Sequence, residues 1–180
     1  MAVETEAPPR TRGDARYKDS VSVRSEILET LEQGPLHRFC ELQALESVPR
    51  TGAAVYTIWD HAGELIYVGV SGRSPTSKTG PWGRLRSHWN GRRSGDQFCV
   101  YVADHYVLPD LTPQQIAAIA DREPTLFIDD LVAERVRRDF CFRIAIVDSY
   151  RDAVAIETAI KQGAFRSIRP RLNPPRNRRR

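Results

Sequence analysis

Two short β-like segments joined by a tight turn constrain the fold of this chain most strongly. The segments are Ala53–Asp60 (AAVYTIWD) and Glu64–Ser71 (ELIYVGVS), and the turn between them contains Gly63. Both segments are rich in β-branched and aromatic residues, which favour strands, and a short glycine-containing connection is typical of a hairpin. We therefore predict an antiparallel hairpin, with Tyr56 on its first strand and Tyr67 on its second.

The segments around this hairpin predict helices and further strands. Apolar periodicity and capping residues favour helices near 22–33, 36–45, 81–90, 112–120, 128–138 and 149–167, and the first two of these form a helical hairpin. The runs 98–107 (FCVYVADHYV) and 140–147 (FCFRIAIV) predict strands. This order predicts an α+β fold, a small layered domain with a central antiparallel β-sheet flanked by helices and an N-terminal helical extension.

Length and composition indicate one domain with appendages. The chain has 180 residues, 41% of them hydrophobic, enough for one core of ordinary size. We expect a disordered polar tail over 1–20, a helical extension over 21–50, the main domain over 51–175 and a basic tail over 176–180. Residues 96–139 are predicted to be an acidic insertion at the rim of the main domain.

The composition argues against membrane-spanning and secreted proteins. No apolar run approaches the roughly 20 residues that span a bilayer, and the N-terminus lacks the apolar core of a secretory signal. The three cysteines (Cys40, Cys99 and Cys141) form no CxxC motif and are odd in number. We interpret them as reduced, mostly buried residues of a cytoplasmic protein rather than as metal ligands.

Basic residues are unevenly distributed along the chain. Residues 70–95 contain six lysines or arginines and no acid, and residues 150–180 contain nine against Asp152 and Glu157. Residues 96–139 reverse the balance, with nine acids against four arginines. Two basic segments around an acidic one favour a surface that binds a polyanion, nucleic acid first, over a merely solvated surface.

Glu157 is the residue hardest to explain by packing alone. It lies within or beside the apolar stripe of the last predicted helix, formed by Ala153, Ile156, Ile160 and Ala164. A carboxylate there loses hydration free energy unless a cation compensates it. The cation is either an arginine in a structural salt bridge or a hard divalent ion, since Mg²⁺ commonly uses only one or two protein carboxylates.

Five further side chains carry chemistry that suits a phosphodiester. Tyr56 and Tyr67 are cross-strand packing residues or, beside a cation, a general base. Arg84 and His88 share one helix face, where the guanidinium suits contact with phosphate and the imidazole can pass a proton. The amide of Asn173 can tie the C-terminal loop to the site. The alternative is that these last three are ordinary surface or turn residues.

In this order the motifs resemble those of the GIY-YIG nuclease superfamily. The family's two tripeptides are similar to Ala54-Val55-Tyr56 and Tyr67-Val68-Gly69, its arginine to Arg84 in GRLRSH, its metal-binding glutamate to Glu157, and its late asparagine to Asn173 in PRLN. The resemblance spans residues 53–175 and rests on the shared order of five elements. Ala54 replaces the family's first glycine, and the 96–139 stretch is longer and more acidic than in the minimal domain.

The resemblance implies a three-stranded antiparallel sheet and a hydrolytic site with one divalent metal ion on Glu157, Mg²⁺ first and Mn²⁺ second. It implies that Tyr56, assisted by Tyr67 or His88, takes a proton from water, and that Arg84 stabilises the phosphate. Asn173 completes the catalytic set. Gly69 allows close approach of the chain at the site. The residues expected to contact nucleic acid are Gly69, Arg73, Lys78, Arg86, Arg92, Arg93 and Arg171.

The predicted function is hydrolysis of DNA phosphodiester bonds by a metal-dependent endonuclease. One alternative is a catalytically silent DNA-binding or regulatory module on the same scaffold, and another is a structural protein whose tyrosines and Glu157 are core residues. RNA stays open as a substrate, because backbone chemistry does not separate it from DNA. The oligomeric state stays open too, and a single active site is expected to nick DNA unless the protein dimerises.

Overall fold

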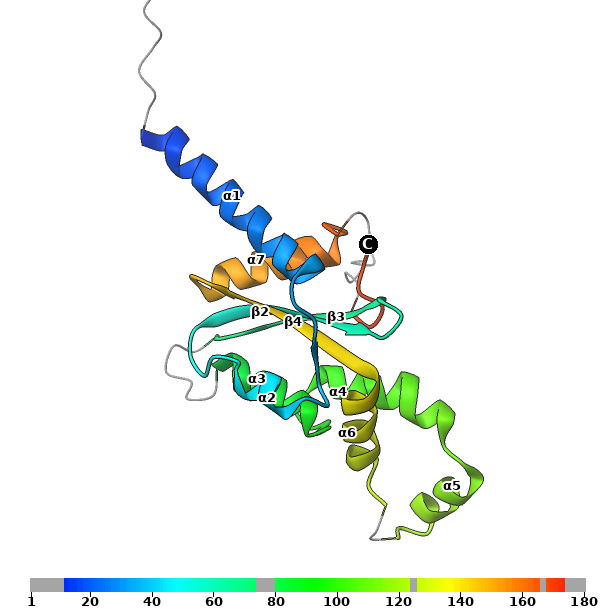
Figure 1. The fold of residues 1–180 in the computed structure, drawn as a ribbon. Helices are drawn as coiled ribbons and strands as arrows, with labels where there is room; N and C mark the ends of the chain where they lie inside the picture. The colour runs from blue at the N-terminus through cyan, green and yellow to red at the C-terminus, as the bar shows by residue number, and fades with distance from the viewer. Residues whose placement is uncertain (1–11, 74–79, 124–125, 166–167, 174–180) are drawn as a thin grey trace, which may run out of the picture.

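A four-stranded antiparallel sheet runs through the middle of the protein. A computed structural model describes residues 12–73, 80–123, 126–165 and 168–173. The strands are β1 (His37–Arg38), β2 (Ala53–Asp60), β3 (Leu65–Ser71) and β4 (Phe140–Val147), in the order β1-β4-β2-β3 (Figure 1). The predicted α+β class is confirmed, and the predicted hairpin forms β2 and β3, with β3 at an edge of the sheet.

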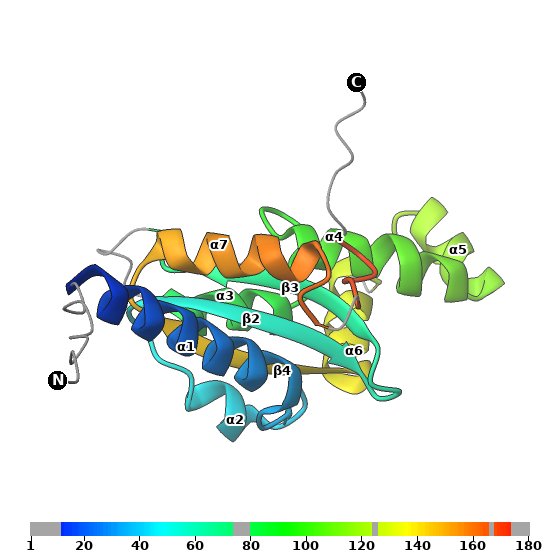
Figure 2. The ribbon, with the colours of Figure 1, turned by 90° about the horizontal axis from the view of Figure 1, so that it is seen from above.

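Helices cover both faces of this sheet. They are α1 (Arg12–Gln33), α2 (Leu42–Glu46), α3 (Gly80–Trp89), α4 (Gln97–Val102), α5 (Pro113–Ala120), α6 (Ile128–Asp139) and α7 (Tyr150–Lys161). Helices α1 and α7 lie on one face, and α2, α3, α4 and α6 lie on the other, whereas α5 projects away from the layers (Figures 1 and 2). The result is a three-layer arrangement with the sheet in the middle.

Each face of the sheet has its own apolar core, because nearly all residues of β2 and β3 are buried. The core beneath α1 and α7 includes Leu31, Val55, Trp59, Val68, Ile156 and Phe165. The core on the α3, α4 and α6 side includes Tyr56, Ile58, Leu85, Phe98, Val136 and Phe142. A hairpin buried on both faces can hold polar side chains at fixed positions, since neither strand has freedom to shift its register.

A bulge in the hairpin places two tyrosines on the same face. Ile58 pairs with Tyr67, whereas the next residue of β2 pairs with Leu65, so Ile66 is an extra residue on β3. Tyr56 pairs with Gly69, and residues two apart on a strand share a face. Tyr56 and Tyr67 therefore both face the α3 layer, with Tyr56 opposite Gly69 and Tyr67 two residues from Gly69 on the same strand.

The N-terminal region differs from the prediction in two ways. Helix α1 begins at Arg12, so the expected disorder is wrong for residues 12–20. Residues 36–45 do not form one helix, because His37 and Arg38 pair with β4 and only Leu42–Glu46 is helical. The apolar spacing in this stretch is compatible with a helix, but it arises from the edge strand β1 followed by the short helix α2. This strand also explains why the sheet has four strands rather than the three implied by the resemblance.

The run 98–107 is helical rather than a strand. It forms α4 and a π-helical turn over Ala103–Val107, which a short 3-10 turn follows. A continuous apolar run does not by itself distinguish a buried strand from a buried helix. Here the N-terminal cap decides, because Asp96 accepts hydrogen bonds from the backbone N–H groups of Phe98 and Cys99 at 3.1 and 3.3 Å.

The 96–139 stretch is not an insertion at the rim, which corrects the prediction. Helices α4 and α6 contribute buried core residues, including Phe98, Val102 and Val136. Helix α5 and the short 3-10 turn Leu108–Asp110 contain no buried residue, and α5 is the part that projects in Figure 2. The net acidity of this stretch therefore does not describe one surface, because part of it lies inside the protein.

The C-terminal segment covers part of the open edge of the sheet. Helix α7 ends at Lys161, six residues earlier than the predicted Ser167. The backbone N–H groups of Arg171 and Leu172 then donate to the carbonyl oxygens of Leu65 and Ile66 at 3.0 and 2.9 Å. These bonds cover part of β3, which would otherwise present unpaired backbone groups.

Within the described ranges, no helix has both the length and the apolar character needed to cross a membrane. The cysteines are free, with Cys99 and Cys141 buried and Cys40 exposed.

Candidate active site

Three buried side chains form a hydrogen-bonded chain between the sheet and α3. The Tyr56 hydroxyl lies 2.9 Å from Nε2 of His88, and Nδ1 of His88 lies 2.6 Å from Oδ2 of Asp96. His88 and Tyr56 are completely buried, and Asp96 nearly so. The arrangement joins a strand, a helix and a loop, so its geometry is held by three separate parts of the fold.

Arg84 supplies a fixed positive charge at the end of this chain. Its Nε donates to the Tyr56 hydroxyl oxygen at 3.3 Å, and its Nη1 reaches the carbonyl oxygen of Gly95 at 3.4 Å. The ring of Tyr67 stacks against that of Tyr56 with their centroids 6.4 Å apart. The expected grouping of both tyrosines with Arg84 and His88 is present in the structure.

The protonation states of Tyr56, His88 and Asp96 follow from their surroundings. Burial lowers the pKa of His88 below its ordinary 6.5, although the bond to Asp96 opposes this, so the imidazole is neutral at neutral pH. Burial alone would raise the pKa of the Asp96 carboxyl, but the hydrogen bond and charge of His88 and the charge of Arg84 outweigh it. A carboxylate accepts a hydrogen bond from Nδ1–H, so Nε2 of His88 is left to accept the phenol proton of Tyr56.

Neither tyrosine is a phenolate at neutral pH. Burial raises the pKa of Tyr56 well above 10, and the neighbouring Tyr67 adds to this effect. Burial also raises the pKa of Tyr67 to about 12. Tyr56 can act as a base only if its own proton leaves at the same time, and His88 is the acceptor in contact with it. We therefore interpret Tyr56 and His88 as one proton-transfer unit.

We expect the protein to lose stability as the pH falls below about 6.5, the ordinary pKa of histidine. Burial holds the folded-state pKa of His88 below that value. The unfolded chain therefore binds the proton first, and the stability contributed by the neutral His88 is lost as the pH falls through its folded-state pKa. Thermal unfolding at a series of pH values measures the effect. A His88→Gln variant with the same pH dependence as the wild type would contradict the assignment.

Gly69 provides the space in which the two tyrosines meet. A Cβ atom at this position would lie 2.3 Å from the Tyr56 hydroxyl oxygen and 2.9 Å from Cε1 of Tyr67. Such distances are far inside van der Waals contact. The close approach at Gly69 is therefore made by the tyrosine rings, rather than by another stretch of chain as the resemblance implied.

A Gly69→Ala substitution is expected to lower the free energy of unfolding by about 1–3 kcal/mol, the usual cost of overpacking a core. It should also disrupt the contact between Tyr56 and His88, since the clash falls on the phenol. Chemical denaturation measures the stability change. Gly63→Ala is the control, because its Cβ would meet nothing within 4 Å and only its φ of +80° is unfavourable. Equal losses of stability in both variants would contradict this account.

Glu157 lies on α7, which packs against β3 on the face of the sheet opposite α3 (Figure 2). Its side chain is 18% exposed, and its Oε1 lies 2.9 Å from Nζ of Lys161. After burial and Asp96, the charge of Glu157 contributes to the raised pKa of Tyr67, so the two side chains are electrostatic neighbours. The expected cation partner is therefore present as a lysine. Mg²⁺ commonly takes one carboxylate together with substrate phosphate and water, so this single carboxylate fits such an ion once Lys161 moves aside.

Asn173 fastens the C-terminal segment to β3 through both ends of its amide. Its Oδ1 accepts from the backbone N–H of Val68 at 3.1 Å, and its Nδ2 donates to the carbonyl oxygen of Val68 at 2.6 Å. Val68 separates Tyr67 from Gly69. Asn173 therefore acts as a positioning residue for this part of the strand.

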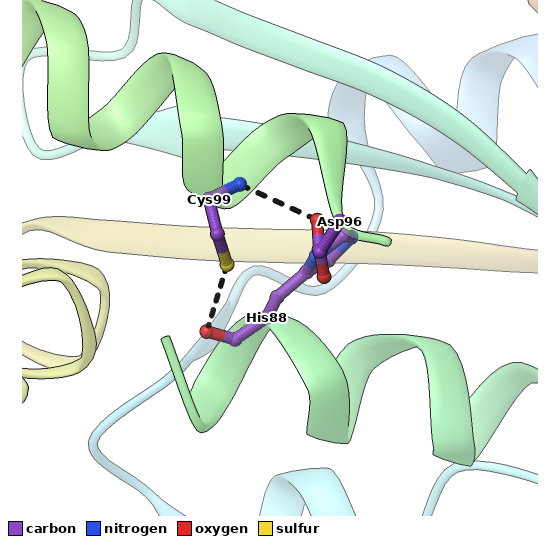
Figure 3. Close-up of side chains that lie close together, drawn as sticks. All are labelled: His88, Asp96 and Cys99. Atoms are coloured by element: carbon purple, nitrogen blue, oxygen red, sulfur yellow. Dashed lines mark hydrogen bonds and ion pairs between the residues drawn. The ribbon is translucent and has the colours of Figure 1, made fainter. Parts of the chain in front are cut away.

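One other cluster has the composition of a metal site. Donor atoms of His88, Asp96 and Cys99 lie within 4.8 Å of one another (Figure 3). Each already has a hydrogen-bond partner, including a 3.7 Å contact from the Cys99 thiol to the carbonyl oxygen of His88. Burial raises the pKa of Cys99, which disfavours the thiolate that a metal would require. We interpret this cluster as a hydrogen-bonded support for His88.

The structure divides the basic residues predicted to contact nucleic acid. Arg73 is exposed and lines a groove beside Arg84. Arg92 is also exposed, beside a second hollow that contains Asp129 and Asp130. Lys78 lies outside the described residues.

The remaining three arginines already have acidic or aromatic partners. Arg93 is 2.6 Å from Asp129, and Arg171 is 3.3 Å from Glu64. Arg86 lies over the Trp89 ring at 4.2 Å and is 3.8 Å from Glu46. These contacts reduce the charge that each arginine can offer to a polyanion.

Sequence reasoning missed Asp96. It was assigned to an acidic insertion, whereas it holds both His88 and the first turn of α4. The available signal was its position directly before an apolar run, where aspartate is a frequent helix cap.

Comparisons of the chain with protein-family models, with curated proteins and with solved structures found no match.

Proposed function

We propose that this protein is a metal-dependent endonuclease that hydrolyses DNA phosphodiester bonds, in the manner of the superfamily that its motifs resemble. The observation that carries the proposal is the buried chain Asp96–His88–Tyr56 ending on Arg84. Burying a carboxylate, an imidazole and a phenol together, beside the half-buried guanidinium of Arg84, costs hydration free energy. Such groups with shifted pKa values cluster at functional sites.

The hydrogen-bonded chain of Asp96, His88 and Tyr56 supplies general-base catalysis in one concerted proton shift. The Tyr56 oxygen takes a proton from the attacking water while the phenol proton moves to Nε2 of His88. The imidazolium that results is stabilised by Asp96, which is held as a carboxylate. Tyr56 never becomes a free phenolate, which its raised pKa disfavours. General-base catalysis of this kind contributes about 10²–10⁴-fold to rate.

Arg84 and Glu157 have different roles toward the phosphate. The guanidinium of Arg84 is permanently charged and offsets the negative charge that develops on the phosphate oxygens. Glu157 would hold the divalent ion, Mg²⁺ or Mn²⁺, which when bound neutralises charge on a non-bridging oxygen and on the leaving oxygen. Tyr67 is 6% exposed, whereas Tyr56 is completely buried, so substrate approaches over the Tyr67 and Arg84 side of the site.

One contact favours a second candidate, a catalytically silent DNA-binding module. Lys161 already neutralises Glu157 at 2.9 Å, so the carboxylate has a partner without any metal ion. In this case the buried chain would be purely structural, and binding to DNA would need no divalent ion.

Incubation of supercoiled plasmid with the protein separates the two candidates. The nuclease proposal expects open-circular or linear product with Mg²⁺ or Mn²⁺ and none with EDTA. Salt-sensitive binding without cleavage, on duplex and single-stranded DNA alike, would overturn the nuclease and support the binding module. Cleavage of RNA but not of DNA would correct the substrate while leaving the chemistry in place.

A further inference from the structure

A groove of about 330 Å³ opens beside Arg84, where the end of β3 meets the first turns of α3 and α7. The polar side chains along it are Ser71, Arg73, Arg84, Ser87 and Tyr150. Since Arg84 also donates to Tyr56, the groove is continuous with the candidate active site. It has enough volume for more than the reacting phosphate group alone.

Ser71 carries the observation that points to a ligand. Its side chain is only 7% exposed, yet its hydroxyl has no hydrogen-bond partner among the described residues. Buried hydroxyl groups in proteins nearly always have a partner, because an unpaired one loses its hydration without compensation. A buried, unpaired hydroxyl on the wall of an open groove is explained if a ligand supplies the partner.

The charge of the groove indicates which ligand. Arg73 and Arg84 are both cationic, and none of the described residues that line the groove is acidic. The first turn of α3 is not counted here, because Pro81 has no N–H group and the N–H of Trp82 already donates to the carbonyl oxygen of Pro49. The Ser71 hydroxyl and the Arg73 guanidinium together match the oxygens of a phosphate group, and Arg84 is left to the phosphate that is cleaved.

The position of Ser71 separates this phosphate from the one that is cleaved. Tyr67, Gly69 and Ser71 alternate along one face of β3, and an extended strand places Ser71 about 13 Å from Tyr67. A single phosphate group cannot reach both residues. Arg84 lies between them, because it contacts Tyr56 and also lines the groove.

We propose that this groove binds a neighbouring backbone phosphate of the substrate strand, through the Ser71 hydroxyl and the Arg73 guanidinium. The inference rests on the proposed function, because it places the strand that is cleaved along the α3 face of β3. Ser71 and Arg73 are binding residues that set the register of the strand, and they take no part in proton transfer.

Binding of a short fluorescein-labelled DNA duplex in EDTA tests the inference without cleavage. Ser71→Ala is expected to weaken binding about 10-fold, as expected for loss of a hydrogen bond to a charged group. Its melting temperature should be unchanged or higher, because the substitution removes an unpaired buried hydroxyl. Weaker stability with unchanged affinity would show that the hydroxyl has an internal role, and would overturn the proposal.

A pair of arginine variants tests the charge. Arg73→Gln should weaken binding and reduce the slope of log affinity against log salt by about one ion. Arg38→Gln is the matched control, because it removes the same charge from exposed Arg38 on β1, at the opposite edge of the sheet. Equal effects of the two variants would show that Arg73 contributes only general surface charge, and would overturn its assignment as a phosphate-binding residue of the groove.

The outcomes also separate this inference from the proposed function. If wild type cleaves DNA while Ser71→Ala and Arg73→Gln bind it normally, the groove assignment is wrong and the nuclease stands. If wild type never cleaves but both variants bind more weakly, the phosphate site stands and the nuclease does not. If wild type binds no duplex at all, both are overturned.

Discussion

Replacing Tyr56 with phenylalanine is expected to lower the rate of DNA cleavage by about 10²–10⁴-fold, the range that general-base catalysis contributes. The substitution removes only the hydroxyl oxygen that joins His88 to Arg84. Water then has no route for its proton into the buried chain. The measurement is the single-turnover rate of cleavage of a labelled duplex with saturating Mg²⁺.

The same substitution also has a predictable structural cost. It leaves Nε2 of His88 and Nε of Arg84 without their partner, which costs about 1–3 kcal/mol for a buried polar group. Activity must therefore be compared at temperatures where both proteins are folded. Tyr106→Phe is the control, since the Tyr106 hydroxyl is buried without a partner in the described part of the chain. A Tyr56→Phe variant that is folded and cleaves at the wild-type rate would contradict the proton-transfer role.

The sequence predicted the hairpin and the residues that it carries, because both signals are local. Strand-forming residues on either side of a glycine turn specify β2 and β3, and helical spacing specifies that Arg84 and His88 lie one turn apart. The grouping of these two residues with Tyr56 and Tyr67 came from the family resemblance. It could not be derived from spacing, since it depends on how α3 packs against the sheet.

Contacts between distant parts of the chain could not be predicted. The bulge at Ile66 decides which face Tyr67 occupies, and nothing in the residue pattern places it there. The role of Asp96 is not evident from the sequence, because the apolar run that begins at Phe98 suits a strand or a buried helix. One carboxylate oxygen of Asp96 caps helix α4, and the other bonds to His88. Without the prediction of α4, neither contact could be predicted.

Charge counts also failed to predict which arginines are available to a ligand. Arg93 and Arg171 contribute to the basic segments, but each lies beside an acid that is far away in the sequence. Arg73 belongs to the same segment as Arg93 and stays exposed. The pairing of a surface arginine is a property of the tertiary fold, so composition gives only the sign of the surface.

Glu157→Gln is expected to lower Mg²⁺-dependent cleavage by at least about 10³-fold. A bound divalent ion contributes several kcal/mol of charge stabilisation in the transition state, and each 1.36 kcal/mol changes the rate tenfold. The variant should stay folded, because its ion pair with Lys161 is partly exposed and such pairs contribute about 0–1 kcal/mol. Glu46→Gln is the matched control, since it removes the same charge and breaks a similar i,i+4 pair, with Arg50.

The most direct test of the central claim is plasmid cleavage by wild type, Glu157→Gln and Glu46→Gln, each with Mg²⁺ and with EDTA. The proposed site predicts metal-dependent nicking or linearisation by wild type and by Glu46→Gln, and none by Glu157→Gln. Cleavage by Glu157→Gln at the wild-type rate would contradict the metal assignment. DNA binding by all three proteins without any cleavage would contradict the nuclease itself.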